Sequence, residues 1–597
     1  MGLEQLEFAF DNKPDTSRQE TALQNVIDLA GAAMHSIRSV ALAGHPIVVA
    51  WSSGKDSSVC LSLTLMVLKE MVVEGLRVPP LVILHADPLI DNPEVSLHAR
   101  REMDNILAFA EKHELNVRIN VSKPSLASSW AVKVLSGRNL PPLPGRPRDC
   151  TMDLKVQPMK KMKKQVMKEM QAEGYSSTQR PVTVIGTRFA ESNGRRKRMT
   201  ERGETSEQVW EDTEGLKLSP IADWSDGELW NYIYACANGK VESYGDFQSL
   251  IDLYLACATE TRQTEFGDTV PVDVRTGCMV CTVGRDKSLE GMVAKGERYV
   301  YLRPLLLLQD FIRNTQFDLD RRQWIGRTIN AEGYIAIGPD TYSPAMLAEL
   351  LRYCLTIDVE EAEAAYAAGL PEPRYKIIRP ESLIAIDAIW SQQGIHRPFE
   401  ALRIYRDVYV EGNRYRIPEL PKPKPVEIPE ARYLYAGDGW MNFDESLKHQ
   451  GTRNVVLEMV SENGSNGCMG TKTLKDGRIV MDTEMSDGEF AVDFESACLI
   501  LDMELDYLLE KYSDPWFPRT QAFRYYSGMG TIQFAKGQIN SSDLIVRRTA
   551  WKESLGLFDM SREELLAQTV SAEEMTGTLP ISHPENCHQN QFRLLAA

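Results

Sequence analysis

The sequence has few cysteines for its size, ten among 597 residues. A chain this long with so few cysteines does not carry the disulfide framework that stabilises small secreted domains. Two of the ten, Cys278 and Cys281, form a Cys-x-x-Cys pair. This pair indicates thiols that are kept reduced, for metal binding or for redox chemistry.

Long apolar runs and a targeting signal are also lacking. No uninterrupted apolar stretch reaches the ~20 residues that a membrane-spanning helix needs. The opening residues, MGLEQLEFAFDNKPDTSRQE, do not show the basic segment followed by an apolar segment that is typical of a secretory signal. We therefore expect a cytoplasmic protein that has no contact with a membrane.

Positive charge is scarce, since 67 Lys and Arg stand against 84 Asp and Glu, for a net charge of −17. A protein with this charge is not built to coat nucleic acid, so any contact with a polyanion has to come from local basic patches. One patch runs from Lys160 to Lys168 and is predicted to lie on a helix. The other, Arg195 to Arg198, is predicted to lie in a loop. The alternative for both is an ordinary solvated surface.

The first half of the chain alternates short β-branched runs with longer helical patterns. This alternation is typical of βαβ units and a parallel sheet, so we predict an α/β fold with flanking helices. The expected strands are 47–51, 81–87, 117–122 and 182–188, and the expected helices are 18–43, 57–74 and 93–113.

The second half is predicted to be a helical extension followed by a region of mixed helices and strands. Between them, RIPELPKPKPVEIPE at 416–430 contains five prolines and is expected to be a linker or an extended strap. The predicted organisation is an N-terminal helical segment (1–40), a nucleotide-binding domain with the cysteines (41–300), a helical extension (301–415), the linker (416–430) and an accessory α+β domain of unknown role (431–597).

A loop of small residues separates the first expected strand from its helix. Its backbone N–H groups at a helix start, together with Lys55 and the serine hydroxyls, are suited to bind an anion. Asp56 would repel a bare phosphate, so the loop favours a nucleotide that carries Mg²⁺. The residues of this predicted site are Ser52, Ser53, Gly54, Lys55, Asp56, Ser57 and Ser58.

This loop does not have the Walker A spacing. It resembles the PP-loop, S-G-G-x-D-S, of ATP pyrophosphatases, with Ser53 in place of the first glycine. The resemblance implies ATP as cofactor, a pyrophosphate held in the loop, and a substrate that is adenylated while pyrophosphate leaves. It also implies an adenine-nucleotide α-hydrolase-like fold.

Further segments resemble those of PP-loop sulfonucleotide enzymes. Asp87 ends the second expected strand, and Gly186-Thr187-Arg188 ends the fourth, where ligands of open α/β sheets bind. The segment 220–225, PIADWS, stands before a further expected helix. We expect Asp87, Gly186 and Arg188 to contact the nucleotide, and Lys55, Asp56 and Arg188 to be catalytic.

From about residue 45 to residue 405, the chain resembles the DndC/SspD-type proteins of bacterial DNA phosphorothioation systems. The similarity is strongest at the loop, at RDCTMDLK (148–155) and at GCMVCTV (277–283) with DKS (286–288). The resemblance implies sulfur incorporation into the DNA backbone in antiviral defence, with DNA, a cysteine desulfurase and other proteins of such a system as partners. It leaves self-association open.

The same resemblance implies a four-iron, four-sulfur cluster on cysteine thiolates. The expected ligands are Cys150, Cys257, Cys278 and Cys281. Zinc on the same thiolates, or a cysteine pair without metal, are the alternatives. Cys587 is compared with the C-terminal catalytic cysteine of sulfonucleotide reductases, but the surrounding motif of those enzymes is missing.

Three alternative functions remain open from the sequence. Two are enzymatic, namely reduction of an adenylylated sulfate and thiolation of RNA. The third is a nucleotide-binding component of a defence complex, which senses ATP without turning it over.

Overall fold

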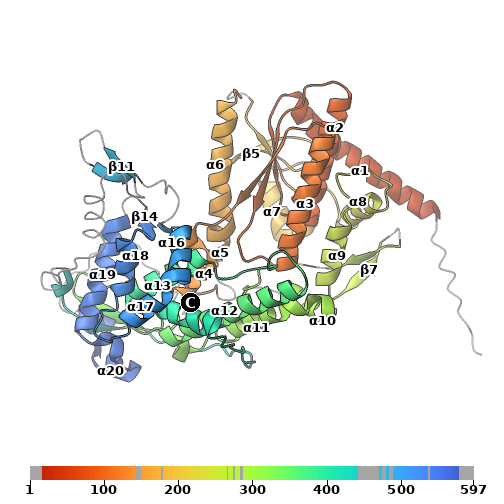
Figure 1. The fold of residues 1–597 in the computed structure, drawn as a ribbon. Coiled ribbons are helices and arrows are strands. Elements are labelled where there is room, and N and C mark those ends of the chain that lie inside the picture. Colours follow the sequence, from red (N-terminus) through yellow and green to blue (C-terminus); the bar gives the residue numbers. More distant parts are fainter. Residues whose placement is uncertain are drawn as a thin grey trace, which may run out of the picture. The chain divides into compact units, whose positions relative to one another are not determined.

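A computed structural model of the chain shows two compact units (Figure 1). Unit 1 comprises Met1–Lys123, Lys155–Cys278 and Arg285–Leu302, and unit 2 comprises Pro124–Leu154, Met279–Gly284 and Arg303–Ala597. The structure describes residues 16–142, 149–175, 179–264, 267–272, 274, 276–282, 287–441, 470–473, 479–482, 489–535 and 538–576. None of the helices in these ranges is both long and apolar enough to cross a membrane.

Unit 1 is built on a six-stranded sheet with the order β3-β2-β1-β4-β6-β5. Five strands are parallel, and β5 runs antiparallel to β6 at one edge. The strands are β1 (Ile47–Ala50), β2 (Leu81–Ala86), β3 (Val117–Ser122), β4 (Val182–Val184), β5 (Trp210–Asp212) and β6 (Gly215–Leu218).

The central strands bury both faces, as parallel strands do. Alternate residues of β1 point to opposite sides, so Val48 packs with α6 (Gln157–Ala172), while Ile47 and Val49 pack on the other face. That second face is covered by helices that appear beside the sheet in Figure 1. They are α1 (Thr16–Leu42), α2 (Lys55–Val73), α3 (Pro93–Lys112) and α8 (Asp226–Ala237).

The α/β prediction is confirmed, with a mostly parallel sheet between helices. The predicted strands and helices of the first 122 residues coincide closely with β1 to β3 and α1 to α3. The lysine-rich segment forms α6, as predicted. Its apolar residues Val166 and Met170 are buried against the sheet, and its lysines lie on the remaining surface.

One local prediction is wrong. Arg195 to Arg198 lie in a helix, α7 (Asn193–Glu201), and not in a loop. The side chain of Ser192 caps the helix by accepting a hydrogen bond from the backbone N–H of Arg195 over 3.2 Å. A serine in this role satisfies one of the N–H groups that a helix start leaves unpaired. Unit 1 also contains two short helices, α9 (Gln248–Cys257) and α10 (Ser288–Ala294).

Unit 2 is mainly helical. Its longer helices include α11 (Arg303–Asn314), α12 (Pro344–Ala367), α13 (Pro380–Gln393) and α19 (Gln538–Ser554). Helices α16 (Phe494–Leu499) and α17 (Leu505–Lys511) are joined by one turn of π-helix. Other short elements are α4 (Trp130–Leu135), α14 (Glu400–Tyr405), α18 (Gln521–Gly528), β13 (Phe490–Val492) and β14 (Ile532–Phe534).

The proline-rich segment has no regular secondary structure, as predicted for a strap. On either side of it, β9 (Tyr334–Ile337) and β10 (Arg432–Tyr435) pair antiparallel, and β15 (Thr569–Val570) adds to β10. The predicted helical extension and C-terminal region therefore share one small sheet inside one compact unit. The role of residues 431–597 as an accessory domain stays a prediction.

Candidate nucleotide site

The predicted loop lies at the point where the order of the parallel strands reverses. Strand β1 has β2 on one side and β4 on the other, and the chain proceeds from β1 through β2 to β3 before it returns to β4. The loop after β1 and the segment after β4 therefore leave the sheet next to each other and diverge. Such switch points at the carboxyl ends of strands are where open α/β sheets bind ligands.

Ser53 adopts a left-handed backbone conformation, with φ at 56°. This conformation is uncommon for a residue with a Cβ atom and suits glycine, the residue that the PP-loop pattern has here. The loop nevertheless closes tightly. The Ser57 hydroxyl accepts from the backbone N–H of Ser52 over 3.1 Å and donates to the carbonyl of Gly54 over 3.0 Å. The Ser58 hydroxyl accepts a hydrogen bond from the Trp51 indole. The hydroxyls of Ser57 and Ser58 therefore both stabilise the loop.

His98 of α3 supports the same loop. Its side chain is buried, with 2% exposed, and its Nε2 lies 3.2 Å from the carbonyl oxygen of Ser53. A carbonyl can only accept, so Nε2 carries the proton, and Nδ1 accepts from the hydroxyl of Ser249 over 2.8 Å. Burial lowers the pKa of His98 to about 4, which keeps this ring neutral at physiological pH.

Gly186 allows the segment after β4 to approach the start of α2. A Cβ atom at this position would lie 2.8 Å from the carbonyl carbon and oxygen of Asp56 and 2.9 Å from the backbone nitrogen of Ser57. Since backbone atoms cannot move aside as a flexible side chain can, any larger residue would separate the two segments. Gly186 therefore brings Arg188 to the loop.

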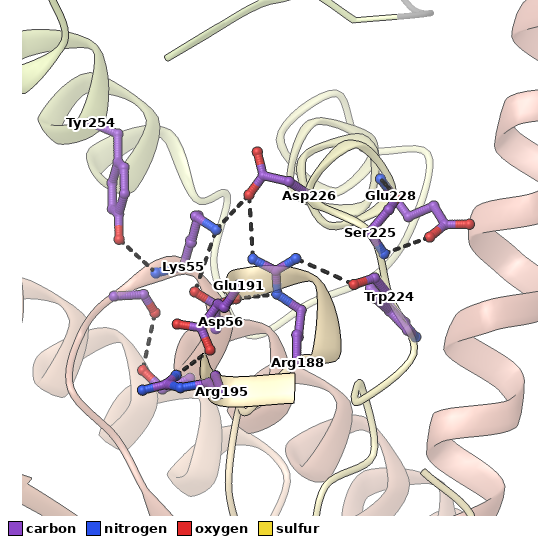
Figure 2. Close-up of polar contacts among 12 residues, drawn as sticks. Lys55, Asp56, Arg188, Glu191, Arg195, Trp224, Ser225, Asp226, Glu228 and Tyr254 are labelled. Carbon is purple, nitrogen blue, oxygen red and sulfur yellow. Dashed lines mark hydrogen bonds and ion pairs between the residues drawn. The ribbon is translucent and has the colours of Figure 1, made fainter. Parts of the chain in front are cut away.

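Lys55, Asp56, Arg188 and Asp226 form one network of charges beside the loop (Figure 2). Lys55 Nζ lies 2.8 Å from Asp226 Oδ1 and 3.4 Å from Asp56 Oδ2. Arg188 pairs with Asp56 through Nε and with Asp226 over 3.3 Å. Its side chain is 2% exposed, and it also donates to the carbonyl of Trp224 over 3.3 Å. Two cations and two carboxylates therefore converge where the resemblance implies a pyrophosphate and Mg²⁺.

Asp226 is the first residue of α8 and was not predicted from the sequence. Burial raises its pKa, but Lys55 and then Arg188 and Arg262 outweigh burial, so the net pKa is lowered. Asp226 is thus ionised at neutral pH. The helix start is fixed by a capping box in which Ser225 accepts from the N–H of Glu228 over 3.2 Å and Glu228 accepts from the N–H of Ser225 over 2.7 Å.

Tyr254 of α9 is the second residue that sequence reasoning missed. Its hydroxyl oxygen accepts a hydrogen bond from the backbone N–H of Lys55 over 3.3 Å (Figure 2). Burial raises its pKa, so the phenol keeps its proton. That proton can be donated to an anion held in the loop. The Ser-x-x-Glu pattern at residues 225–228 is a sequence signal that could have pointed to Asp226, whereas nothing in the local pattern points to Tyr254.

Asp87 stands at the end of β2, as predicted, at the same edge of the sheet as the loop. Its carboxylate accepts from the backbone N–H of Leu89 over 2.9 Å, which shapes the turn that follows. Farther along this turn, Asp91 pairs with Lys155 over 3.3 Å. Burial raises the pKa of Asp91, and Lys155 opposes this effect.

The basic helix α7 follows Arg188 directly. Arg195 pairs with Glu191, and Arg196 donates through Nε to the carbonyl of Phe189 over 3.3 Å. Lys197 and Arg198 are exposed. This helix therefore places positive charge on the surface immediately after the segment that Gly186 anchors.

The four predicted metal ligands are divided between the two units, two in each. Cys257, at the end of α9, is buried, and Cys278, whose backbone bridges Asp91, is half-buried; both belong to unit 1. Cys150 and Cys281 are half-buried and belong to unit 2. Within the described ranges, no three side chains of His, Cys, Asp or Glu gather as ligands of one metal ion would. The iron–sulfur and zinc sites on these cysteines therefore stay predictions. Cys587 lies outside the described residues.

Residues 46–241 match the family model of the phosphoadenosine phosphosulfate reductase domain. No curated protein is significantly similar to the chain. Two solved structures of Candida glabrata FMN adenylyltransferase are weakly similar, at 14% identity and a TM-score of 0.23. The match to the complex with FMN and the ATP analog AMPCPP covers 41% of this chain and 69% of the adenylyltransferase chain. The match to the complex with FAD and inorganic pyrophosphate covers 47% of this chain and 81% of the adenylyltransferase chain.

The family match coincides with the parallel sheet and with the elements that hold the charge network. It begins at the residue before β1 and ends just after α8, so it includes Lys55, Asp56, Arg188 and Asp226. Residues 46–241 are therefore similar to the phosphoadenosine phosphosulfate reductase domain of the PP-loop superfamily, and the charge network lies inside this match.

Proposed function

We propose that the chain is an ATP pyrophosphatase that adenylates a backbone phosphate of DNA, so that sulfur can replace one non-bridging oxygen. The observation that carries the proposal is the convergence of Lys55 and Arg188 on the loop after β1, each held by the carboxylates of Asp56 and Asp226. This arrangement offers two cations for phosphoryl oxygens and two carboxylates for the Mg²⁺ that accompanies ATP.

The loop would hold the β,γ-pyrophosphate of ATP. Backbone N–H groups at the start of α2, the exposed hydroxyl of Ser52 and the phenol of Tyr254 are the neutral donors. Lys55 and Arg188 exchange part of their pairing with Asp226 for phosphate oxygens. The donor set fits Mg²⁺, since one or two carboxylates together with substrate phosphates are its usual ligands. When bound, that ion neutralises charge on the pyrophosphate.

In the proposed first step, a non-bridging oxygen of the DNA phosphate attacks the α-phosphorus of ATP. A bond forms between this oxygen and the α-phosphorus, and the bond from the α-phosphorus to the bridging oxygen breaks. Pyrophosphate leaves with that electron pair. Lys55 and Arg188 stabilise the charge that develops on the phosphoryl oxygens, which is the main contribution that a protein makes to phosphoryl transfer.

In the second step, sulfur at the oxidation level of hydrosulfide attacks the phosphorus of the adenylated backbone. A phosphorus–sulfur bond forms, and AMP leaves with the oxygen. No electrons are exchanged. Sulfur delivered instead as a persulfide, from a cysteine desulfurase partner, requires a second thiol that reduces the sulfur–sulfur bond.

The basic helix α7 supports a polynucleotide as substrate. Its exposed residues Lys197 and Arg198 follow the nucleotide-contacting segment and are suited to bind backbone phosphates without reading bases. The rest of the chain carries a net charge of the opposite sign, so this local patch is where a polyanion would be bound.

The first experiment measures pyrophosphate release by the purified full-length chain with ATP, Mg²⁺ and duplex DNA. Lys55→Ala should lower the rate about 10²–10³-fold. The matched control is Lys69→Ala, which changes the same residue type on the same helix at its pair with Glu242 and should leave the rate unchanged. ATP binding without any pyrophosphate release would contradict the proposal and favour a sensing role.

The second experiment identifies the substrate. Nuclease-digested DNA from the native host is analysed by mass spectrometry for phosphorothioate-linked dinucleotides, and the host is compared with a strain that carries Asp56→Ala. We expect these dinucleotides only in the first strain. If both strains lack them while pyrophosphate release persists, the nucleotide chemistry stands and DNA is not the substrate; thiolated RNA is then sought in the same strains.

The family match specifically favours one alternative, reduction of an adenylylated sulfate. That reaction produces sulfite and needs two electrons from a dithiol. Incubation with 3′-phosphoadenylylsulfate and a reduced dithiol protein would give sulfite if this alternative holds. Under the adenylation proposal no sulfite forms.

A further inference from the structure

A cavity of about 350 Å³ lies within unit 2, far along the chain from the nucleotide site. It is bounded by the segments around β9, by the end of α13 and by one side of α19. Four residues of α19 line it, Ile545, Arg548, Thr549 and Lys552. Their spacing, three, four and seven residues from the first, places them on one face of the helix.

Positive charge exceeds negative charge in this cavity. Arg327, Arg548 and Lys552 line it, and among the described lining residues Asp340 is the one acidic side chain. Asp340 pairs with Arg327 over 3.0 Å. Arg548 lies over the ring of Trp440, with its guanidinium carbon 4.7 Å from the ring centre. Basic side chains therefore outnumber acidic ones among the described residues that line the cavity.

Lys552 is the most unusual of these residues because it is buried, with 4% exposed. Its Nζ donates to the carbonyl of Gly326 over 2.7 Å. Burial, together with Arg548 and Arg327, lowers the pKa of this amine to about 7, and Asp340 opposes these effects. A buried charge of this kind is costly unless it is paired. The described residues give Lys552 a carbonyl partner and no carboxylate partner, and an anion in the cavity would pair with its charge.

The rest of the wall is suited to an organic body. Ile325, Ile395 and Phe558 line the cavity with apolar surface. Gln393 also lines it, and its Oε1 is buried without a hydrogen-bond partner among the described residues. A ligand that donates one hydrogen bond to this oxygen would satisfy it. Mostly apolar walls with a few converging polar groups are typical of small-molecule sites of this volume.

We propose that this cavity binds a small organic phosphate, in which one phosphate group meets Arg548 and Lys552 and a planar or apolar body fills the remainder. The volume admits a molecule of about the size of a nucleoside monophosphate and excludes a polynucleotide. The site is separate from the loop after β1, so this inference does not depend on the function proposed above.

The test uses the full-length chain with Lys55→Ala, which weakens the nucleotide site, and measures binding of labelled AMP by equilibrium dialysis. Adding Lys552→Met removes the buried charge and keeps the length of the side chain. Lys511→Met is the matched control, because it makes the same change at a lysine on α17 that does not line the cavity. Adenosine and inorganic phosphate are the probes for body and anion alone.

We expect Lys55→Ala to bind one AMP, Lys552→Met to weaken this binding at least ~10-fold, and Lys511→Met to leave it unchanged. Pyrophosphate release by a chain with Lys552→Met alone should equal that of the wild type. If Lys552→Met does not fold, Ile545→Phe, which fills the cavity from the same helix face, replaces it. Absence of AMP binding to Lys55→Ala, or binding that survives both cavity variants, would overturn the proposal. Phosphate binding as tight as that of AMP would overturn the role of the organic body.

Discussion

The ring of His98 donates a hydrogen bond from Nε2 to the carbonyl oxygen of Ser53, 3.2 Å away. The residue that accepts this bond is the one that takes a left-handed conformation in the loop. A neutral, buried histidine on α3 thus stabilises the backbone position at which the PP-loop pattern has a glycine. The shape of the nucleotide site depends on this contact between residues 45 positions apart.

His98→Ala should weaken ATP binding more than it slows chemistry. Loss of one buried hydrogen bond costs about 1 kcal/mol, or roughly a fivefold change in an equilibrium constant. We therefore expect KM for ATP to rise about fivefold with little change in kcat. Steady-state pyrophosphate release measures both. A fall in kcat at unchanged KM would instead mean that His98 acts on the reaction itself.

Ser53→Gly should be tolerated, because glycine adopts the left-handed conformation without strain. Glycine relieves backbone strain in the folded state, which stabilises the protein, and it gives the unfolded chain more conformational freedom, which destabilises it. Each effect on the free energy of unfolding is within about 1 kcal/mol, so the midpoint of chemical unfolding should shift little. Ser53→Val should lower it clearly, since a β-branched residue is a genuine outlier at φ 56°. Equal effects of the two substitutions would show that the conformation does not matter.

Gly186→Ala should abolish pyrophosphate release. The added methyl group would sit 2.8 Å from backbone atoms of Asp56, so either the segment after β4 or the start of α2 has to shift. Arg188 would then lose its position at the loop. Gly194→Ala, in α7, is the control, since its nearest neighbour is a side-chain atom 3.7 Å away. Circular dichroism separates loss of the site from loss of the fold.

Asp226→Asn should have opposite effects on two ligands. Lys55 and Arg188 lose a carboxylate partner, so free pyrophosphate without Mg²⁺ should bind more tightly. Turnover of Mg·ATP should fall, because a proposed Mg²⁺ ligand is gone. Calorimetry and pyrophosphate release test the two halves separately. Weaker binding of both ligands would contradict the assignment of Asp226 as a partner that the substrate phosphates displace.

Lys552 should make the free energy of unfolding depend on pH above neutrality. Its pKa is about 7 in the folded chain, below the ordinary value of 10.5. Between these values the unfolded state binds more protons, so the contribution of this residue to stability rises as pH increases from about 7 to 10.5. The difference in unfolding free energy between wild type and Lys552→Met, measured across this range, isolates that contribution from those of other groups. A difference that is constant with pH would contradict the lowered pKa.

Much of unit 1 could be predicted because its signals are local. An apolar run of strand length before Ser52–Ser58 and a helical pattern after it specify β1, the loop and α2, and the same reasoning gives β2 and β3. The pairing of Lys55 with Asp226 could not be predicted in this way, since it joins residues 171 positions apart through the order of the strands.

Arg195 to Arg198 show a different limit. Four consecutive basic residues repel one another and have no apolar periodicity, so the pattern favours a loop. The cap supplied by Ser192, the pair of Glu191 with Arg195 and the burial of Met199 outweigh that preference and form α7. Unit 2 was hard to predict because β9, β10 and β15 are short and pair over long distances along the chain.

Segments of the two units alternate along the chain, and this alternation affects how the protein is synthesised and how it can be truncated. Residues 124–154 belong to unit 2, and there the indole of Trp390 donates to the carbonyl of Leu135 over 2.8 Å and Arg138 pairs with Glu489. When the last strand of the unit 1 sheet has been synthesised, residues 124–154 have therefore already left the ribosome, but their partners in unit 2 have not yet been synthesised. At roughly 5–20 residues per second, that segment waits for tens of seconds before unit 2 can close around it. No single cut in the chain yields either unit with all of its own residues.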